Sequence, residues 1–364
     1  MAIKRFFLLL IFIMALSGCA IKGEIYEKTP HAYEPKDEIP SELTVVKSYV
    51  EIKNHLENII GLGIDSTKLA VVDYWGDIEK DLKEIIGELT TEDPLGIYAV
   101  SSVAYEQAKA SGYYQVNISV QYKKTSEEIR SIITVKSDEE LENELIDMLS
   151  DFQSKKVFRV WKAYDVETLN EIVKKAYYSS PSSAVGLKNV SFGPLNEGSN
   201  GQIFEVSAEY LYTHDELFMK KQQIEQAGAE MCAEAENYTT DEKIAFIYDK
   251  ISEIELDSEA MIVVTETGDT QHKTDTYSAY GAIFNKKSAQ SGIAMTEKLM
   301  CDILEIPNRI IVGKKDGVPH IWLMIQRGES WQHFDATGGR ENYIISSIDL
   351  AQHYEYNMEI YDFQ

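Results

Sequence analysis

Hydrophobic and polar residues alternate with a period of two in two separate stretches of the chain, residues 114–122 and 202–210. This alternation is typical of β-strands that bury one face and expose the other. Apolar stretches at about 98–105 and 187–193 precede them and predict a partner strand for each. Because a helical pattern comes before each pair of strands, we expect the region 44–228 to contain two α-β-β units.

The two predicted units match each other at a displacement of 88 residues. Asp77-Ile-Glu79 corresponds to Asp165-Val-Glu167 where each helix begins, and residues 122–129 correspond to 210–217 after the second strand. We interpret the match as a weak internal repeat. Two α-β-β units can also look alike through a shared periodicity, so duplication and chance similarity both stay open.

A further helical pattern from about 214 to 234 leads into the C-terminal third of the chain. The segment Thr239-Thr-Asp-Glu242 has the form of a capping box, in which the first and last residues satisfy each other's backbone amides. Four apolar residues then lie on one helical face: Ile244, Ile247, Tyr248 and Ile251. A helix that begins after Thr239 and packs through this face is therefore predicted.

The composition indicates a folded, acidic protein. A chain of 364 residues with 44% hydrophobic content is long enough for two or three packed domains. Acidic residues number 60 against 35 Lys and Arg, a balance that repels phosphates. Nucleic acid is therefore excluded as a partner, and so is electrostatic docking on anionic lipid.

The N-terminus has the pattern of a secretory signal. Lys4 and Arg5 precede the eleven apolar residues Phe6–Leu16, which are too few to span a bilayer as a helix. The following Leu16-Ser-Gly-Cys19 resembles the lipobox of bacterial lipoproteins. The resemblance implies removal of residues 1–18, a lipid anchor with palmitate on Cys19, and an extracytoplasmic chain attached to the membrane. An ordinary signal peptide with an incidental cysteine is the alternative.

Residues 19–43 are predicted to form a tether, since residues 20–43 hold three of the eight prolines and little apolar periodicity. Beyond Cys19 only Cys232 and Cys301 remain, which is too few for a disulfide framework. No Cys-x-x-Cys or His-Cys cluster is present, so we expect neither a metal site nor a cofactor. His272 and His333 lack metal-ligand spacing and are predicted to be surface or strand residues.

Six short segments of the C-terminal third resemble, in order, the bacterial transglutaminase-like family of the papain type. They are Asp241–Asp249, Tyr277–Ile283, Ser291–Ala294, Leu304–Gly313, His320-Ile-Trp322 and Trp331–Thr337. The resemblance implies an α+β fold, in which the two α-β-β units precede a papain-like transglutaminase-like domain over residues 229–364.

The family's chemistry needs a Cys at a helix N-terminus, a His that takes its proton and an Asp that orients the His. His320 and Asp335 stand at the matching positions, but Gln290 stands where the Cys belongs. An amide nitrogen is not basic, so Gln290 cannot act as the nucleophile. The resemblance therefore implies an inherited and inactive His–Asp pair, although such a pair can also be purely structural.

Three other residues could replace the missing thiol. Cys301 lies eleven residues along the same predicted helix, about 16 Å away at 1.5 Å per residue. We expect it to be a core residue. Ser288 and Ser291 lie next to the vacant position, so a Ser–His–Asp hydrolase or acyltransferase is the alternative enzyme.

The leading hypothesis is a surface-anchored, non-catalytic transglutaminase-like lipoprotein. Its cleft would bind an extended peptide, a cell-wall (peptidoglycan) stem peptide or an envelope protein through main-chain contacts. The serine enzyme is the second hypothesis. The third is a structural envelope-assembly protein whose two N-terminal units dock another envelope protein.

Overall fold

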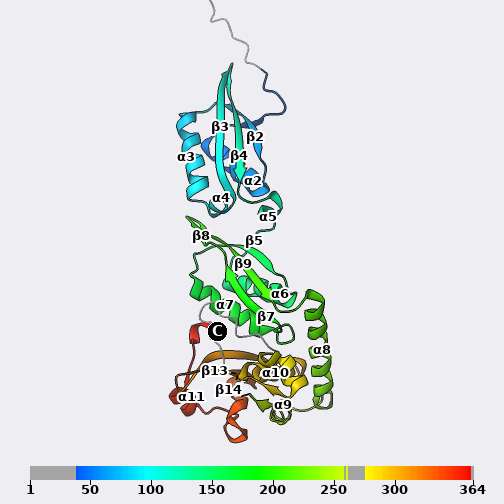
Figure 1. Ribbon diagram of the computed structural model, residues 1–364. Helices are drawn as coiled ribbons and strands as arrows, with labels where there is room; N and C mark the ends of the chain where they lie inside the picture. The colour runs from blue at the N-terminus through cyan, green and yellow to red at the C-terminus, as the bar shows by residue number, and fades with distance from the viewer. Residues whose placement is uncertain (1–37, 258–259, 261–274, 362–364) are drawn as a thin grey trace, which may run out of the picture.

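The computed structural model describes residues 38–257, 260 and 275–361. The signal segment, Cys19 and His272 lie outside the described residues, so the predictions about them stay predictions. Figure 1 shows three bodies stacked one above another, with the N-terminal body at the top. Within the described ranges, no helix is long and apolar enough to cross a bilayer.

The first body is a four-stranded sheet in the order β1-β2-β4-β3. β1 is parallel to β2, and the other neighbours are antiparallel. Its elements are β1 (Thr44–Val46), α2 (Tyr49–Leu62), β2 (Ser66–Val72), α3 (Ile78–Thr91), α4 (Pro94–Ala99), β3 (Val100–Ala110), β4 (Tyr113–Tyr122) and α5 (Ser126–Arg130).

The second body repeats this topology, with the sheet order β5-β6-β9-β7 and β8 paired to β9. β5 is again parallel to β6, and β6 and β7 are antiparallel to β9. Its elements are β5 (Ile133–Thr134), α6 (Asp138–Ser150), β6 (Lys155–Val160), α7 (Val166–Ser179), β7 (Leu187–Phe192), β8 (Asn196–Gly198) and β9 (Gly201–Tyr210).

Each unit is larger than the sequence pattern suggested. The helix-strand-strand order is present as α3-β3-β4 and α7-β7-β9, but a β-α-β segment precedes it in both bodies. β1 has three residues and β5 has two, too short to show a period. The matched aspartates have a physical role, because Asp77 and Asp165 are the N-caps of α3 and α7.

A network of charges joins the first two bodies. Glu205 on β9 lies 2.5 Å from Lys124 Nζ and 3.0 Å from Lys155 Nζ, and it accepts a hydrogen bond of 2.7 Å from the Tyr98 hydroxyl. The β8–β9 turn approaches the start of α4 so closely that a Cβ on Gly198 would lie 2.3 Å from Glu92 O. The contact between the bodies is therefore specific and leaves no room for a larger residue at Gly198.

The third body contains a sheet in the order β14-β13-β12-β15, with helices α8, α9 and α10 packed near it. Its principal elements are α8 (His214–Cys232), α9 (Thr240–Ile251), α10 (Gln290–Ile303), β12 (Asn308–Lys315), β13 (Val318–Arg327), β14 (Ser330–Phe334), α11 (Ser347–His353), β15 (Tyr354–Glu355) and α12 (Met358–Tyr361). Shorter elements are η1 (Ala233–Ala235), β10 (Glu255–Leu256), η2 (Asp275–Tyr277), a π-helical turn η3 (Gly281–Asn285), β11 (Lys287–Ser288), η4 (Ala336–Gly338) and η5 (Arg340–Asn342).

The predicted start and face of α9 are confirmed. Thr239 and Glu242 form the reciprocal capping box, and the four apolar residues of the predicted face are its buried residues. α8 runs continuously across position 228, where the sequence analysis divided the chain. The first two bodies have mixed sheets, the four-stranded sheet of the third body is antiparallel, and helices pack with all of them, so the chain has the predicted α+β class.

The substitution Glu205→Gln is expected to lower the free energy of unfolding at pH 7 by about 2 kcal/mol, since it removes charge-assisted bonds between the two bodies. Burial alone would raise the pKa of Glu205, but the bonds from Lys124, Tyr98 and Lys155 lower it to about 2. The stabilisation is therefore present above the carboxyl's ordinary pKa and is lost as the pH falls toward 2. Chemical denaturation of both proteins across this range measures it.

Glu209→Gln is the matched control, because Glu209 lies on the same strand in an exposed pair with Lys188. Its effect should stay below about 1 kcal/mol. Equal effects of the two substitutions would show that the Glu205 network does not hold the bodies together.

Candidate functional site

Gln290 is the first residue of α10, and the N-cap before it, Ala289, offers no side-chain hydrogen bond. Asn308, the first residue of β12, donates a 2.7 Å hydrogen bond to Asp302 near the other end of α10. The helix packs along β12 and β13, so it runs antiparallel to β12. His320 pairs with Gly313 near the end of β12. Gln290 and His320 therefore lie toward the same end of the sheet.

The structure brings His320 and Asp335 together. His320 Nε2 lies 2.8 Å from Asp335 Oδ2, and both side chains are buried. His320 shares one face of β13 with Trp322, whereas the residues of β13 that pack with α10 lie on the other face. Gln290 and His320 could therefore meet only past the end of β13. No hydrogen bond joins these two described side chains in the structure.

Asp335 is fully buried and accepts five hydrogen bonds. Its Oδ1 accepts from the Thr337 amide (3.0 Å) and the Thr337 hydroxyl (2.6 Å). Its Oδ2 accepts from His320 (2.8 Å), Lys315 (2.9 Å) and Tyr354 (2.9 Å). Burial alone would raise the pKa of Asp335, but the hydrogen bonds from His320, Thr337 and Lys315 outweigh it and hold the pKa well below its usual range. The carboxylate is therefore ionised and orients the imidazole.

Aromatic rings enclose the imidazole of His320. Its ring stacks on Trp322 and meets Tyr354 edge to face, each with 5.9 Å between ring centroids. Trp322 Nε1 donates to His333 Nδ1 at 2.9 Å. Burial lowers the pKa of His333 to about 4, so it stays neutral and serves as an acceptor. The sequence predicted His333 to be either a surface residue or a strand residue. It is a strand residue, on β14, and it is buried.

The Gln290 side chain has no described polar partner. Its Oε1 atom is buried and makes no hydrogen bond. Neither serine is bonded to His320: the Ser288 hydroxyl donates to Thr276 O at 2.6 Å, and the Ser291 hydroxyl donates to Tyr277 O at 3.0 Å. Both serines are buried, so these carbonyl bonds fix their hydroxyls.

Cys301 is fully buried in the core between α10 and the sheet. Burial raises the pKa of its thiol well above the ordinary value. Cys232 is also buried, and its pKa rises to about 11 for the same reason. Both thiols are free in the structure and are core residues.

Sequence reasoning missed Glu297, a buried carboxyl on α10. It is 1% exposed, and the Tyr343 hydroxyl donates to it at 2.7 Å. Burial raises the pKa of Glu297 to about 8, with a smaller contribution from the charge of Asp335, and the Tyr343 bond opposes this shift. Glu297 lies seven residues after Gln290, which places both on nearly the same helical face. Thr296 and Lys298 flank Glu297 in the sequence, so no local hydrophobic pattern signalled its burial.

Across the described ranges, no group of three or more His, Cys, Asp or Glu side chains is placed to hold a metal ion. The groups around His320 are the Asp335 carboxylate, the Lys315 ammonium and the Tyr354 phenol, and the ammonium and the carboxylate neutralise each other. The arrangement holds an imidazole beside an ionised carboxylate, and neither Ser288 nor Ser291 is hydrogen bonded to that imidazole.

No protein-family profile matches the chain, and no curated protein does. Several solved structures are similar to parts of the chain, and three of them illustrate the likeness. A TGase shares 15% identity with a TM-score of 0.29, over 61% of each chain. A proposed cysteine protease from Cytophaga hutchinsonii shares 12% identity with a TM-score of 0.24, over 48% of this chain and 76% of that one.

The third similar structure is a proposed protease from Parabacteroides distasonis, at 8% identity and a TM-score of 0.24, over 74% of this chain and 39% of that one. The chain thus spans about three fifths of the TGase's length. All three TM-scores lie below 0.5, so the family of the C-terminal body is argued from its own elements and residues.

Replacing Glu297 with Gln is expected to raise the free energy of unfolding by about 3 kcal/mol at pH 7. The folded protein keeps the Glu297 proton up to about pH 8, whereas the unfolded chain releases it near 4.5. Wild-type stability should therefore fall as the pH rises through this window, and Glu297→Gln removes that dependence. Chemical denaturation at pH 4.5, 7 and 8.5 measures it.

Glu341→Gln serves as the control, because Glu341 is exposed. Its effect should stay within about 0.5 kcal/mol at every pH. A gain for Glu297→Gln that does not shrink toward pH 4.5 would contradict a protonated, buried carboxyl.

Proposed function

We propose that the chain is a lipid-anchored, extracytoplasmic protein whose transglutaminase-like C-terminal body binds a peptide without catalysing acyl transfer. The single observation that carries the proposal is the identity of residue 290. A glutamine begins α10, while His320 and Asp335 remain hydrogen bonded. The ligand would be an extended segment of an envelope protein or a cell-wall peptide, since main-chain recognition needs no thiol.

The order of elements supports a transglutaminase-like body. A capped first helix, a central helix, a His strand and an Asp at the end of the next strand follow one another as the family's motifs do. Asp335 also caps the short helix η4 through Thr337, which gives Asp335-Ala-Thr337 a structural reason. These features support a scaffold shared with the transglutaminase-like family. Whether the body can catalyse acyl transfer then depends on the side chain at position 290.

The hydrogen bonds and the burial of the neighbouring hydroxyl and thiol groups argue against a substitute nucleophile. Ser288 is packed so tightly that a Cβ on Gly292 would lie 2.0 Å from its Oγ. Ser291 is bonded to a carbonyl, and Cys301 is fully buried. A serine enzyme would need one of these groups to break its bond and reach His320.

A second candidate function is docking of another envelope component on the N-terminal unit. Trp75, in the segment between β2 and α3, is 98% exposed. The residue lies at the end of the sheet where Val72 pairs with Tyr113. An exposed indole of this kind is typical of interaction surfaces, because it carries a large apolar area with a polar tip.

The variant Gln290→Cys tests the position of the proposed vacant nucleophile. A thiol at the first position of α10 and within reach of His320 should have a lowered pKa. At pH 7, iodoacetamide should modify residue 290 about fivefold to tenfold faster than it does in the Gln290→Cys, His320→Ala double variant. Peptide mapping by mass spectrometry assigns the modified cysteine. Wild-type protein should show no transglutaminase or peptidase activity.

Ser291→Cys is the matched control, since it places a thiol one residue further along, in a buried position. This thiol and the native Cys232 and Cys301 should stay unmodified in the folded protein. An unreactive thiol in the Gln290→Cys variant would show that the position does not face the His–Asp pair. Wild-type activity that survives Cys301→Ala and is abolished by Ser288→Ala or Ser291→Ala would establish a serine enzyme instead.

The variant Cys19→Ala tests the anchor. The lipobox-like Leu16-Ser-Gly-Cys19 predicts that the wild-type chain is lipidated and processed, and that the variant is neither. Metabolic labelling with a fatty-acid analogue in a bacterial host measures it. Equal labelling of the two proteins would exclude Cys19 as the attachment site.

A further inference from the structure

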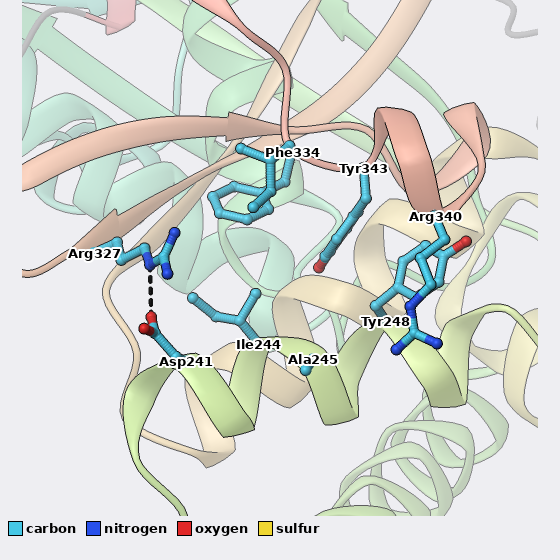
Figure 2. Close-up of a pocket in the computed structure, with 9 residues that line it drawn as sticks. Asp241, Ile244, Ala245, Tyr248, Arg327, Phe334, Arg340 and Tyr343 are labelled. Atoms are coloured by element: carbon cyan, nitrogen blue, oxygen red, sulfur yellow. Dashed lines mark hydrogen bonds and ion pairs between the residues drawn. The ribbon is translucent and has the colours of Figure 1, made fainter.

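A groove lies between α9 and the β14 side of the sheet (Figure 2), and neither His320 nor Asp335 lines it. Its volume is about 210 Å³. Nine residues line it: Asp241, Ile244, Ala245, Tyr248, Arg327, Phe334, Arg340, Tyr343 and Ile344. We infer that this groove binds one aromatic side chain of a partner peptide together with a neighbouring carboxylate.

The inference deepens the proposed peptide binding and rests on it, but it concerns a different surface. The floor of the groove is apolar and rigid. Phe334, Tyr343 and Ile244 are all buried, and the rings of Phe334 and Tyr343 meet at a centroid distance of 5.2 Å and an angle of 66°. The ring of Tyr248 lies on the side of Tyr343 away from Phe334, with 4.6 Å between the centroids of the two tyrosine rings. Phe334 is fully buried behind these two tyrosines, and the small exposed edges of Tyr343 and Tyr248 can meet another ring in the offset or edge-on geometries that aromatic pairs prefer.

The wall that carries Tyr343 is fixed by backbone hydrogen bonds to the sheet. The Asp335 amide donates to Tyr343 O at 2.8 Å, and the Ile345 amide donates to His333 O at 2.9 Å. The Tyr343 hydroxyl is occupied by Glu297, so the part of the ring in the groove presents carbon. Ile344 beside it is 47% exposed, which leaves an apolar residue at the mouth for a ligand to cover.

The size of the groove selects a single side chain. An apolar cavity of roughly 150 Å³ binds benzene, whereas pockets for drug-sized ligands begin near about 300 Å³. A volume of about 210 Å³ therefore suits one six-membered ring with its methylene. A larger ligand would lie mostly outside the groove, as a peptide chain does when one side chain serves as its anchor.

Two guanidinium groups flank this apolar floor (Figure 2). Arg327 Nε pairs with Asp241 at 2.5 Å, and Arg340 Nη2 pairs with Asp249 at 2.9 Å. Each aspartate engages one nitrogen, which holds the guanidinium in place and leaves further N–H groups for a ligand. Both arginine side chains are partly exposed, at 39% and 68%.

Arg340 is the better placed of the two for a ligand carboxylate. It is the more exposed, and its guanidinium carbon lies 5.6 Å from the centroid of the Tyr248 ring, a position that fixes the orientation of the fork. Arginine forks bind carboxylates through paired hydrogen bonds. A ring seated on the floor would thus have a carboxylate within reach of Arg340, from the peptide's C-terminus or from an adjacent acidic side chain.

The test uses the full chain and three probes measured by ligand-observed NMR titration. N-acetylphenylalanine carries a free terminal carboxylate, N-acetylphenylalanine amide carries none, and N-acetyl-Asp-Phe amide carries a side-chain carboxylate. N-acetylphenylalanine has about 15 heavy atoms, which predicts a Kd on the order of 1 mM for a ligand of ordinary efficiency. Tighter binding of one carboxylate probe than of the other identifies the source of the carboxylate.

Ala245→Phe should abolish binding of all three probes, because Ala245 lines the groove from the exposed side of α9 and a ring there would fill it. Ala229→Phe, at an exposed position of α8, should leave binding unchanged. Arg340→Gln should weaken the preferred carboxylate probe at least about fivefold and leave the amide unaffected.

Three results would overturn the inference. They are no binding of any probe at 20-fold the predicted Kd (about 20 mM), binding that survives Ala245→Phe, and equal loss of the amide and the carboxylate probes in Arg340→Gln. Each is separable from the proposed function, because thiol reactivity of Gln290→Cys reports on the other site. If no probe binds the groove but the thiol of Gln290→Cys is reactive, the inference about the groove is wrong and the proposed function still stands.

Discussion

The end of the C-terminal sheet depends on one buried carboxylate. Burying a charge without partners is costly, so Asp335 must be surrounded by donors wherever the chain places it. Those donors come from four places: β12, β13, η4 and β15, through Lys315, His320, Thr337 and Tyr354. The carboxylate therefore ties three strands of the sheet to the segment that follows β14. Losing a donor would remove part of the compensation of this buried charge, and losing Lys315 would remove its ammonium partner.

Under the proposed function, the same carboxylate explains how a His–Asp pair would persist without catalysis. Holding these segments together does not require a thiol, so a glutamine at position 290 would not unfold the body. The imidazole of His320 is enclosed by Trp322 and Tyr354 on the face of β13 opposite to α10. We infer peptide binding on another surface, the groove between α9 and the β14 side of the sheet, where an arginine and fixed rings meet.

Sequence patterns predicted the features that local chemistry determines. The capping box at Thr239 and the buried face of α9 follow from four residues and a helical period. The His320–Asp335 contact could be anticipated from the family resemblance and from the short turn that joins the two strands, although the register places Leu323 opposite Phe334 and leaves His320 diagonal to Asp335. The three-residue strand β1 could not be predicted from the sequence, since so short a segment shows no hydrophobic period. Glu297 and the groove depend on tertiary packing, which brings Tyr343 against α10 from about 46 residues away.

The central claim is that residue 290 leaves this body without a nucleophile. Intact-protein mass spectrometry of the wild-type chain, after incubation with a fluorophosphonate and with a cysteine-directed acylating probe, tests it most directly. The account predicts an unmodified mass for the folded C-terminal body. A stoichiometric adduct on Ser288, Ser291 or Cys301 that disappears in His320→Ala would contradict it, because only an activated nucleophile depends on that imidazole.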